Sequence, residues 1–139
     1  MIQGGDSDGD GIGGDSKWGE NGFEQEICDN LKHFSGAVAY AIPADKRNRS
    51  QFYIVTGLQD INEDYFKEYN ISCDDETKQM YYEKGGYPFL DGGYEVFGQV
   101  FEGLDVCFKI AETATNSSDR PLEDVVIEYA KMEEYKSEN

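Results

Sequence analysis

The sequence predicts a mainly β domain, and three features of its 139 residues support that prediction. Sixteen glycines are spread between short apolar runs, a pattern that favours many tight turns between short strands. The run from Arg49 to Gly57 is rich in apolar, aromatic and β-branched residues and ends at a glycine, which is typical of a buried strand. The aromatic content of 14% and the hydrophobic content of 38% supply material for a single core.

Five stretches are predicted to contain strands, because apolar or β-branched residues run together there between turn-forming residues. Pro43 separates the second stretch from the third, since a proline removes a ladder hydrogen bond. The last stretch is expected to be a closing strand. In chain order the five are residues 1–3, 36–41, 49–57, 94–100 and 125–132.

Capping residues and apolar spacing predict two short helices. Asp74 or Asp75 can cap the first, which is expected to run through Lys84 and to stop at Gly85 and Gly86. The second is predicted near residues 103–111, because its apolar residues share one helical face. Those residues are Leu104, Cys107, Phe108 and Ala111.

We expect residues 1–139 to form one domain, since no internal repeat or second core is evident. Within it, residues 58–88 are polar and acidic and are interpreted as an insertion that carries the first helix. Residues 133–139 form a charged tail that is expected to fray.

The net charge of −17 and the pI near 4.2 bound the possible partners. Nucleic-acid backbones and anionic membranes are bound mainly through Lys and Arg, so neither is an expected partner. No apolar stretch is long enough to cross a bilayer, and no signal peptide is evident. The ordinary interpretation of the charge is a solubilising surface on a monomer.

The cysteines and the single histidine predict no metal centre. Cys28, Cys73 and Cys107 are scattered and form no C-x-x-C pair, and His33 cannot complete a zinc site by spacing. The three cysteines are interpreted as reduced thiols, which favours a cytoplasmic location. His33 could act as a general base, but a buried, hydrogen-bonded histidine is the favoured interpretation.

An aspartate-rich stretch raises one alternative, a calcium site. Asp6 to Gly11 matches the first half of an EF-hand loop. The twelfth loop position should be a bidentate glutamate, but it is Lys17 here, and no flanking helices are predicted. A calcium-responsive domain is therefore only a third, weaker hypothesis, and no cofactor or metal is expected.

Gln51 stands inside the apolar run 49–57, where a buried amide must be paired or must face a ligand. It is part of a set of motifs that occur in a fixed order along residues 1–110: MIQGGD, GxGxGGxSxWG, LKHxxG, SQFYIVTG, LDGxYxVFGxV and EGLDVxxKI. Together they resemble the cyclophilin-type peptidyl-prolyl cis-trans isomerases, of a bacterial type. The resemblance implies a closed or partly open β-barrel with short helices, and an enzyme that assists protein folding by isomerising X-Pro bonds.

The resemblance also implies a set of site residues. Gln3, Gln51 and Tyr53 take the catalytic positions, at which the two amides hold the substrate backbone. Aromatic and methionine side chains form an adaptable apolar socket for the proline ring. Tyr53 stands where the family usually has Phe, Phe89 where it has Trp or another large residue, and Ile42 where an Asn is common. The substrate-binding positions are Met1, Ala41, Ile42, Phe89, Leu90 and Tyr94.

In the family, two strands, a helix and an F-x-R-x-I segment with the catalytic arginine precede the equivalent of Met1. The sequence is therefore expected to be an N-terminally truncated member, and Arg47, Arg49 and Arg120 are not in that context. Loss of a preorganised cation lowers rates by about two to three orders of magnitude. The first hypothesis is an isomerase of proline-containing peptides and folding proteins, with weakened activity. The alternative is a module that binds proline segments without turning them over.

Overall fold

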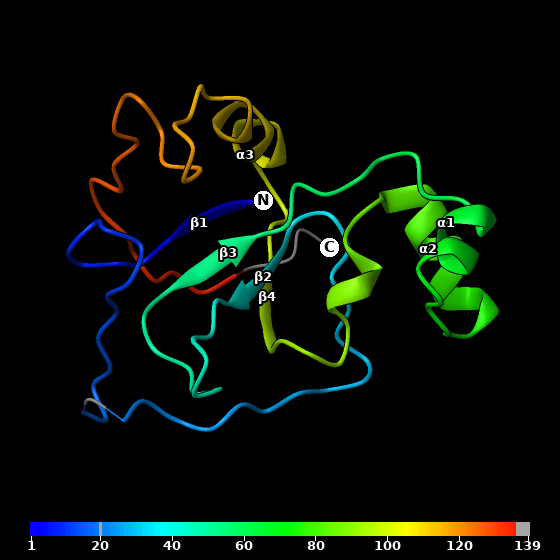
Figure 1. The fold of residues 1–139 in the computed structure, drawn as a ribbon, viewed down its shortest axis with the longest axis horizontal. Coiled ribbons are helices and arrows are strands. Elements are labelled where there is room, and N and C mark those ends of the chain that lie inside the picture. The colour runs from blue at the N-terminus through cyan, green and yellow to red at the C-terminus, as the bar shows by residue number, and fades with distance from the viewer. Residues whose placement is uncertain (20, 136–139) are drawn as a thin grey trace.

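The structure, a computed structural model, describes residues 1–19 and 21–135. At its centre lies a four-stranded antiparallel sheet in the order β1-β3-β2-β4 (Figure 1). The strands are β1 (Ile2–Gly4), β2 (Ala37–Tyr40), β3 (Phe52–Ile54) and β4 (Val96–Gln99). In the described part of the chain β1 and β4 pair on one side only, so the sheet is open rather than closed into a barrel. The mainly β prediction is confirmed in this coarser form.

The second, third and fourth predicted stretches each contain one of these strands, and the first overlaps β1, which extends one residue further to Gly4. Their register places Gln3 of β1 and Ala39 of β2 opposite Tyr53, on either side of β3. Because side chains in paired positions lie on the same face of a sheet, this register gathers β1, β2 and β3 residues around Tyr53. The pairing of β2 with β4 shifts register between Val38 and Ala39.

The predicted closing strand at residues 125–132 is wrong, since this stretch forms no strand in the structure. Val126 and Ile127 remain exposed, although the Cδ1 atom of Ile127 lies 3.9 Å from the place that a Cβ on Gly4 would occupy. An apolar run supplies side chains for a strand, but a strand also needs a neighbouring edge that offers ladder hydrogen bonds. In the described part of the chain no edge pairs with this stretch.

Both predicted helices are present. They are α2 (Asp75–Lys84), capped by the Asp74 carboxylate, which accepts a hydrogen bond from the Thr77 amide at 2.8 Å, and α3 (Leu104–Ala111). Gly85 ends α2 with a φ of 69°, a conformation that favours glycine.

Two short elements were not predicted, namely α1 (Glu63–Glu68) and the 3₁₀ turn η1 (Pro88–Leu90). Asn62 caps α1 by accepting from the amides of Asp64 and Tyr65, and this N-cap signal was available in the sequence.

The insertion packs as a separate unit beside the sheet. Figure 1 shows α1 and α2 together on one side of the molecule, while α3 lies next to β1 and β3. Ile61, Phe66 and Tyr81 form the buried centre of this unit. A second buried cluster, built on Tyr53, belongs to the sheet. Among the described residues no helix is long and apolar enough to span a membrane.

Candidate functional site

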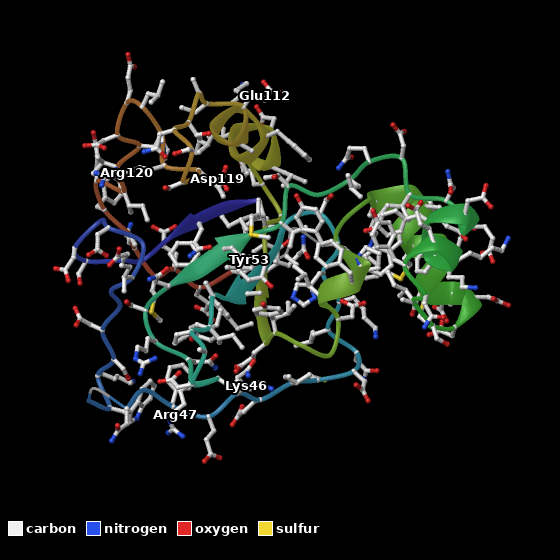
Figure 2. The ribbon with its side chains drawn as sticks, viewed as in Figure 1. Lys46, Arg47, Tyr53, Glu112, Asp119 and Arg120 are labelled. Atoms are coloured by element: carbon white, nitrogen blue, oxygen red, sulfur yellow. The ribbon has the colours of Figure 1, made fainter. Side chains whose placement is uncertain are left out.

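Tyr53 lies at the centre of the candidate site. It comes from the middle of β3, is 3% exposed, and sits near the middle of the sheet (Figure 2). Three other residues of the implied site pack, partly buried, against its cluster: Ala41, Leu90 and Tyr94. The fold therefore brings together side chains from β3, from the residue after β2, from η1 and from the segment between η1 and β4.

The two glutamines form a polar relay at the edge of this cluster. The Gln3 Nε2 group donates to Gln51 Oε1 at 2.7 Å, and the Gln51 Nε2 group donates to the Gly13 carbonyl at 2.6 Å. Gln51 is thus both buried and paired, which is one of the two states expected for an amide in apolar surroundings. Gln3 is exposed, so the free end of the relay faces solvent.

A cleft of about 400 Å³ opens beside the relay. Both glutamines line it, together with residues of the glycine-rich loop. Ala41 and Ile42, two of the positions that the resemblance assigns to substrate binding, also line it. The remaining lining residues are Gly11, Ile12, Gly13, Gly14, Pro43 and Arg49.

Arg49 brings a cation to this cleft, a feature that sequence reasoning missed. Its guanidinium binds the Asp45 carboxylate at 2.7 Å, and this hydrogen bond lowers the pKa of Asp45 and raises that of Arg49. The other two arginines are engaged with backbone carbonyls, Arg47 with that of Asn21 and Arg120 with that of Gly9. In Figure 2 both lie well away from Tyr53.

The hydroxyl of Tyr53 is buried and has no hydrogen-bond partner in the described part of the chain. Burial, helped by Tyr94 and Asp91, raises the pKa of Tyr53 far above its usual value, so the phenol is neutral. Two rings fix its position, with His33 stacked at 6.0 Å between centroids and Tyr94 edge-on at 6.0 Å. The Tyr53 ring is therefore held in place by its neighbours, and its hydroxyl is one unused polar atom.

Asp91 holds the turn that follows η1. Its carboxylate accepts from the His33 amide at 2.9 Å and lies 2.9 Å from the His33 Nδ1 atom. The Tyr81 hydroxyl of α2 donates to the other carboxylate oxygen at 2.8 Å. His33 is fully buried, as expected, but its Nε2 atom has no partner among the described residues. The LDG motif contained Asp91, yet nothing in the sequence connected it to Tyr81.

Met1 and Phe89 lie at the rim rather than in the floor, with exposed fractions of 45% and 52%. The amino group of Met1 donates to the Tyr87 hydroxyl at 3.2 Å, and the Tyr87 and Phe89 rings lie 5.4 Å apart. Sequence reasoning missed Tyr87, which packs against the Tyr53 cluster.

The aspartate-rich loop uses its carboxylates to fold itself. Asp6 accepts from the amides of Gly11 at 2.6 Å and Asp8 at 3.2 Å, and Asp10 accepts from the amide of Ile12. Backbone hydrogen bonds of this kind lower the pKa of Asp6. Among the described residues, no group of three or more His, Cys, Asp or Glu side chains is placed to hold a metal ion. The loop geometry therefore gives the calcium hypothesis no support.

The chain was compared with known families and proteins. The family model "Cyclophilin type peptidyl-prolyl cis-trans isomerase/CLD" matches residues 1–132. A protein of Staphylococcus aureus, whose name assigns it to the peptidyl-prolyl cis-trans isomerases, is 37% identical over 135 residues, which are 96% of this chain and 68% of that protein. A protein of Staphylococcus epidermidis with the same name is 36% identical over the same shares.

Solved structures agree with the sequence relatives. A cyclophilin-type peptidyl-prolyl cis-trans isomerase of Cryptosporidium parvum, crystallised with the dipeptide Ala-Pro, superposes with a TM-score of 0.61 and 26% identity over 88% of this chain. A second structure of that protein gives a TM-score of 0.63 over 91% of this chain. The chain spans 61% and 62% of the length of these two structures. By sequence and by fold, it belongs to the cyclophilin-type peptidyl-prolyl cis-trans isomerase family.

Proposed function

We propose that this chain binds proline-containing segments of peptides and folding proteins and accelerates rotation about the X-Pro bond. The observation that carries the proposal is the Gln3–Gln51–Gly13 relay next to the Tyr53 cluster, in a chain of this family. Apolar walls suit a proline ring, and the exposed amide end of the relay suits a substrate carbonyl or amide. Tyr53, Leu90 and Tyr94 are assigned to the socket, and Met1 and Phe89 to its rim.

Catalysis of this rotation involves no covalent step. The barrier is the partial double bond of the amide, on the order of 18–20 kcal/mol for a peptide unit. A catalyst must therefore bind the twisted amide better than either planar form. In the proposed site the socket holds the proline ring, while the relay holds the backbone on the other side of the bond. Rigid placement of both favours the twisted geometry, since neither part has to reorganise.

A cation near the prolyl nitrogen would add to this, because the nitrogen lone pair is released when the amide twists. In the family the F-x-R segment supplies that cation, whereas Arg47, Arg49 and Arg120 are engaged in the described part of this chain. We propose that a strand-bearing segment of this kind, paired to the open edge of β1 or β4, would extend the sheet toward a barrel and raise the rate. Removal of such a donor costs about 10²- to 10³-fold in other enzymes.

The same engagement of the arginines favours a second candidate function, recognition of proline segments without turnover. The protein would then hold one planar isomer in the socket. In both cases we propose a monomer acting in the cytoplasm, where the three unbridged cysteines would stay reduced.

Two-dimensional NMR exchange on an Ala-Pro peptide, with and without the chain, separates the two candidates. Accelerated exchange supports the isomerase, and shifts of Tyr53 and Gln51 signals without acceleration support the binding module. A covalent fusion that adds an F-x-R segment before Met1 should raise the exchange rate. An unchanged rate in a folded fusion would contradict the proposed role of the cation.

A further inference from the structure

A second cavity, of about 380 Å³, shares no lining residue with the cleft beside the two glutamines. None of its lining residues belongs to the Tyr53 cluster either. Its volume falls within the range of small-molecule pockets. We call it the junction cavity, because two helices, a strand and a loop meet there. It is lined by Phe34 and Ser35 from the loop before β2, Lys84 at the end of α2, Gln99 at the end of β4 and Leu104 at the start of α3.

The walls of the junction cavity are held together by direct contacts. The Nε2 group of Gln99 donates to the Ser35 carbonyl at 3.1 Å, which joins the end of β4 to the loop before β2. A Cβ on Gly36 would lie 2.5 Å from Gln99 Nε2 and 3.5 Å from Leu104 Cδ1. The loop backbone therefore approaches both the strand and α3 closely, and the cavity is formed by segments that are fixed to one another.

Lys84 brings an unpaired cation to the junction cavity. Its Nζ atom lies 5.5 Å from the centroid of the Phe34 ring, and the Phe34 ring packs 4.5 Å from the Tyr81 ring. Lys84 forms no ion pair with any described residue, although the chain has 29 acidic side chains. Ion pairs do engage most of the other basic side chains, namely Lys32, Arg47, Arg49, Lys67, Lys78, Lys109, Arg120 and Lys131.

Ser35 supplies a buried hydrogen-bond donor. It is 8% exposed, and its hydroxyl oxygen accepts from the Gln59 Nε2 group at 3.1 Å. A serine hydroxyl also has one hydrogen to donate, and no described residue accepts it. Donation to a charged acceptor is stronger than donation to a neutral one, so an anionic oxygen is the favoured partner for this hydrogen.

The lining residues select the chemistry of a ligand. One ammonium group and one hydroxyl donor suit a single carboxylate, whose two oxygens can each accept a hydrogen bond. The Phe34 ring and the Leu104 side chain suit a short apolar group attached to it. A dianion such as a phosphate ester is disfavoured, because the cavity offers one cation and the net charge of −17 repels the second negative charge.

The acidic residues next to the lining residues in the sequence do not compete for Lys84. The Glu83 carboxylate accepts from the Gln79 amide at 2.9 Å, one turn back on α2. The Asp105 carboxylate binds Lys109 at 3.0 Å on α3. Both carboxylates are thus engaged on their own helices, which leaves the Lys84 ammonium to a ligand.

We propose that the junction cavity is a second binding site, which takes a carboxylate carried on a short apolar group. Lys84 and Ser35 bind the carboxylate oxygens, and Phe34 and Leu104 pack against the apolar part. A free carboxylic acid and the C-terminal carboxylate of a polypeptide share this chemistry. The inference goes beyond the proposed function, because the site uses none of the residues assigned to the proline socket.

The test uses the full chain and probes of matched length, namely hexanoate, 1-hexanol and hexylamine. Each is titrated at constant ionic strength, since salt screens the charge of the protein. NMR shifts of the Phe34 ring and of the Ser35 and Gln99 amides report binding at the junction cavity. Acetyl-Ala-Leu with a free C-terminal carboxylate, and the same peptide as its C-terminal amide, distinguish the two sources of the carboxylate.

We expect hexanoate to bind about 5- to 20-fold more tightly than 1-hexanol, from one exposed ion pair and one hydrogen bond to a carboxylate. Hexylamine should bind most weakly. Lys84→Gln and Ser35→Ala should each weaken hexanoate binding by about 3- to 10-fold, whereas Lys84→Arg keeps the cation and should keep most of the affinity.

Lys17→Gln is the matched control. The Lys17 Nζ atom also lies over an aromatic ring, 4.4 Å from the centroid of Trp18, and it forms no ion pair with a described residue. Lys17 lines neither the junction cavity nor the cleft. Its substitution removes the same charge from the protein and should leave hexanoate binding unchanged.

The outcomes decide the proposal. Equal binding of hexanoate and 1-hexanol would overturn it. Equal weakening by Lys17→Gln and Lys84→Gln would show general charge attraction and would also overturn it. Binding of the free-carboxylate peptide, but not of its amide, would support the site and assign it to polypeptide C-termini, while binding of hexanoate alone would support it as a site for free acids. The rate of Ala-Pro exchange tests the proposed function separately, since Lys84→Gln should leave that rate unchanged.

Discussion

The Tyr81 hydroxyl of α2 donates a hydrogen bond to the Asp91 carboxylate at 2.8 Å and accepts one from the His33 amide at 3.1 Å. The inserted helix is thereby joined to the turn that follows η1. Asp91 also binds the side chain of His33, whose ring stacks on Tyr53. A chain of direct contacts thus runs from the insertion to the floor of the proposed socket.

Tyr81→Phe removes this link while keeping the ring in its core. Two buried hydrogen bonds are lost, one of them to a carboxylate, so the free energy of unfolding should fall by about 1–3 kcal/mol. The turn that carries Leu90 should also loosen, which lowers kcat/KM for X-Pro peptides. Urea unfolding and exchange NMR measure the two effects. Tyr82→Phe is the matched control, since the Tyr82 hydroxyl binds Glu63 at the surface, and it should lose clearly less stability. Equal losses in both variants would show that the link has no special weight.

Tyr53→Phe should stabilise the protein. The buried hydroxyl has no partner among the described residues, and an unpaired buried hydroxyl costs about 1–3 kcal/mol. Its removal should raise the free energy of unfolding by about 1 kcal/mol, measured by urea denaturation, with catalysis retained because the apolar face remains. If the free energy of unfolding of Tyr53→Phe fell by more than about 1 kcal/mol instead, the hydroxyl would have a hydrogen-bond partner in solution.

Stability should fall in alkali through Tyr53. Burial raises its pKa in the folded state far above the usual value of 10.0, so the folded state holds its proton more tightly than the unfolded chain. The stabilising contribution is complete below pH 10 and is lost as the pH rises above it. The fall in the urea midpoint between pH 8 and pH 11 should therefore be smaller in Tyr53→Phe than in the wild type. Equal falls in the two proteins would contradict the raised pKa.

Gln51→Ala should lower kcat/KM without unfolding the protein. The substitution removes the acceptor for Gln3 and the donor to Gly13, so the exposed amide of the relay loses its fixed position. Loss of one neutral hydrogen bond in the transition state corresponds to about 2- to 10-fold. Peptide exchange rates and a thermal melt on the same sample measure activity and folding. Gln79→Ala on α2, whose amide donates to Glu83 at the surface, should leave the rate unchanged.

Gly86→Ala should destabilise the junction between the insertion and the sheet. Its φ is 137°, and an added Cβ would lie 2.2 Å from the His33 carbonyl oxygen. Gly92→Ala has the same kind of backbone, with a φ of 74°, but its Cβ would meet no atom within 4 Å. Backbone strain costs about 1–2 kcal/mol in both, and the clash should add roughly 1–3 kcal/mol at Gly86 alone. Similar unfolding midpoints for the two variants would contradict the close approach.

Several parts of the molecule could be predicted because their signal is local. The strand at 52–54 follows from adjacent apolar and β-branched residues, and α2 follows from an aspartate cap and a glycine stop. The apolar neighbours of Gln51 indicated that its amide is paired or faces a ligand, and the structure shows it paired with Gln3 and Gly13. The ordered motifs identified the family, which the comparisons confirmed. The helix α1 was missed because six residues in an acidic segment carry little periodicity, although Asn62 marked its start.

The sequence by itself therefore determined the family, four strands and two helices. It predicted residues for the candidate site, but it did not indicate Arg49 in the cleft or Tyr87 beside the Tyr53 cluster. Only the tertiary structure decided that residues 125–132 are not a strand, because ladder hydrogen bonds depend on a neighbouring edge rather than on the residues themselves. It also decided that Tyr81 binds Asp91 and that Arg49 faces the cleft beside Asp45. Those contacts depend on the packing of whole elements against one another, and a local residue pattern contains no information about that packing.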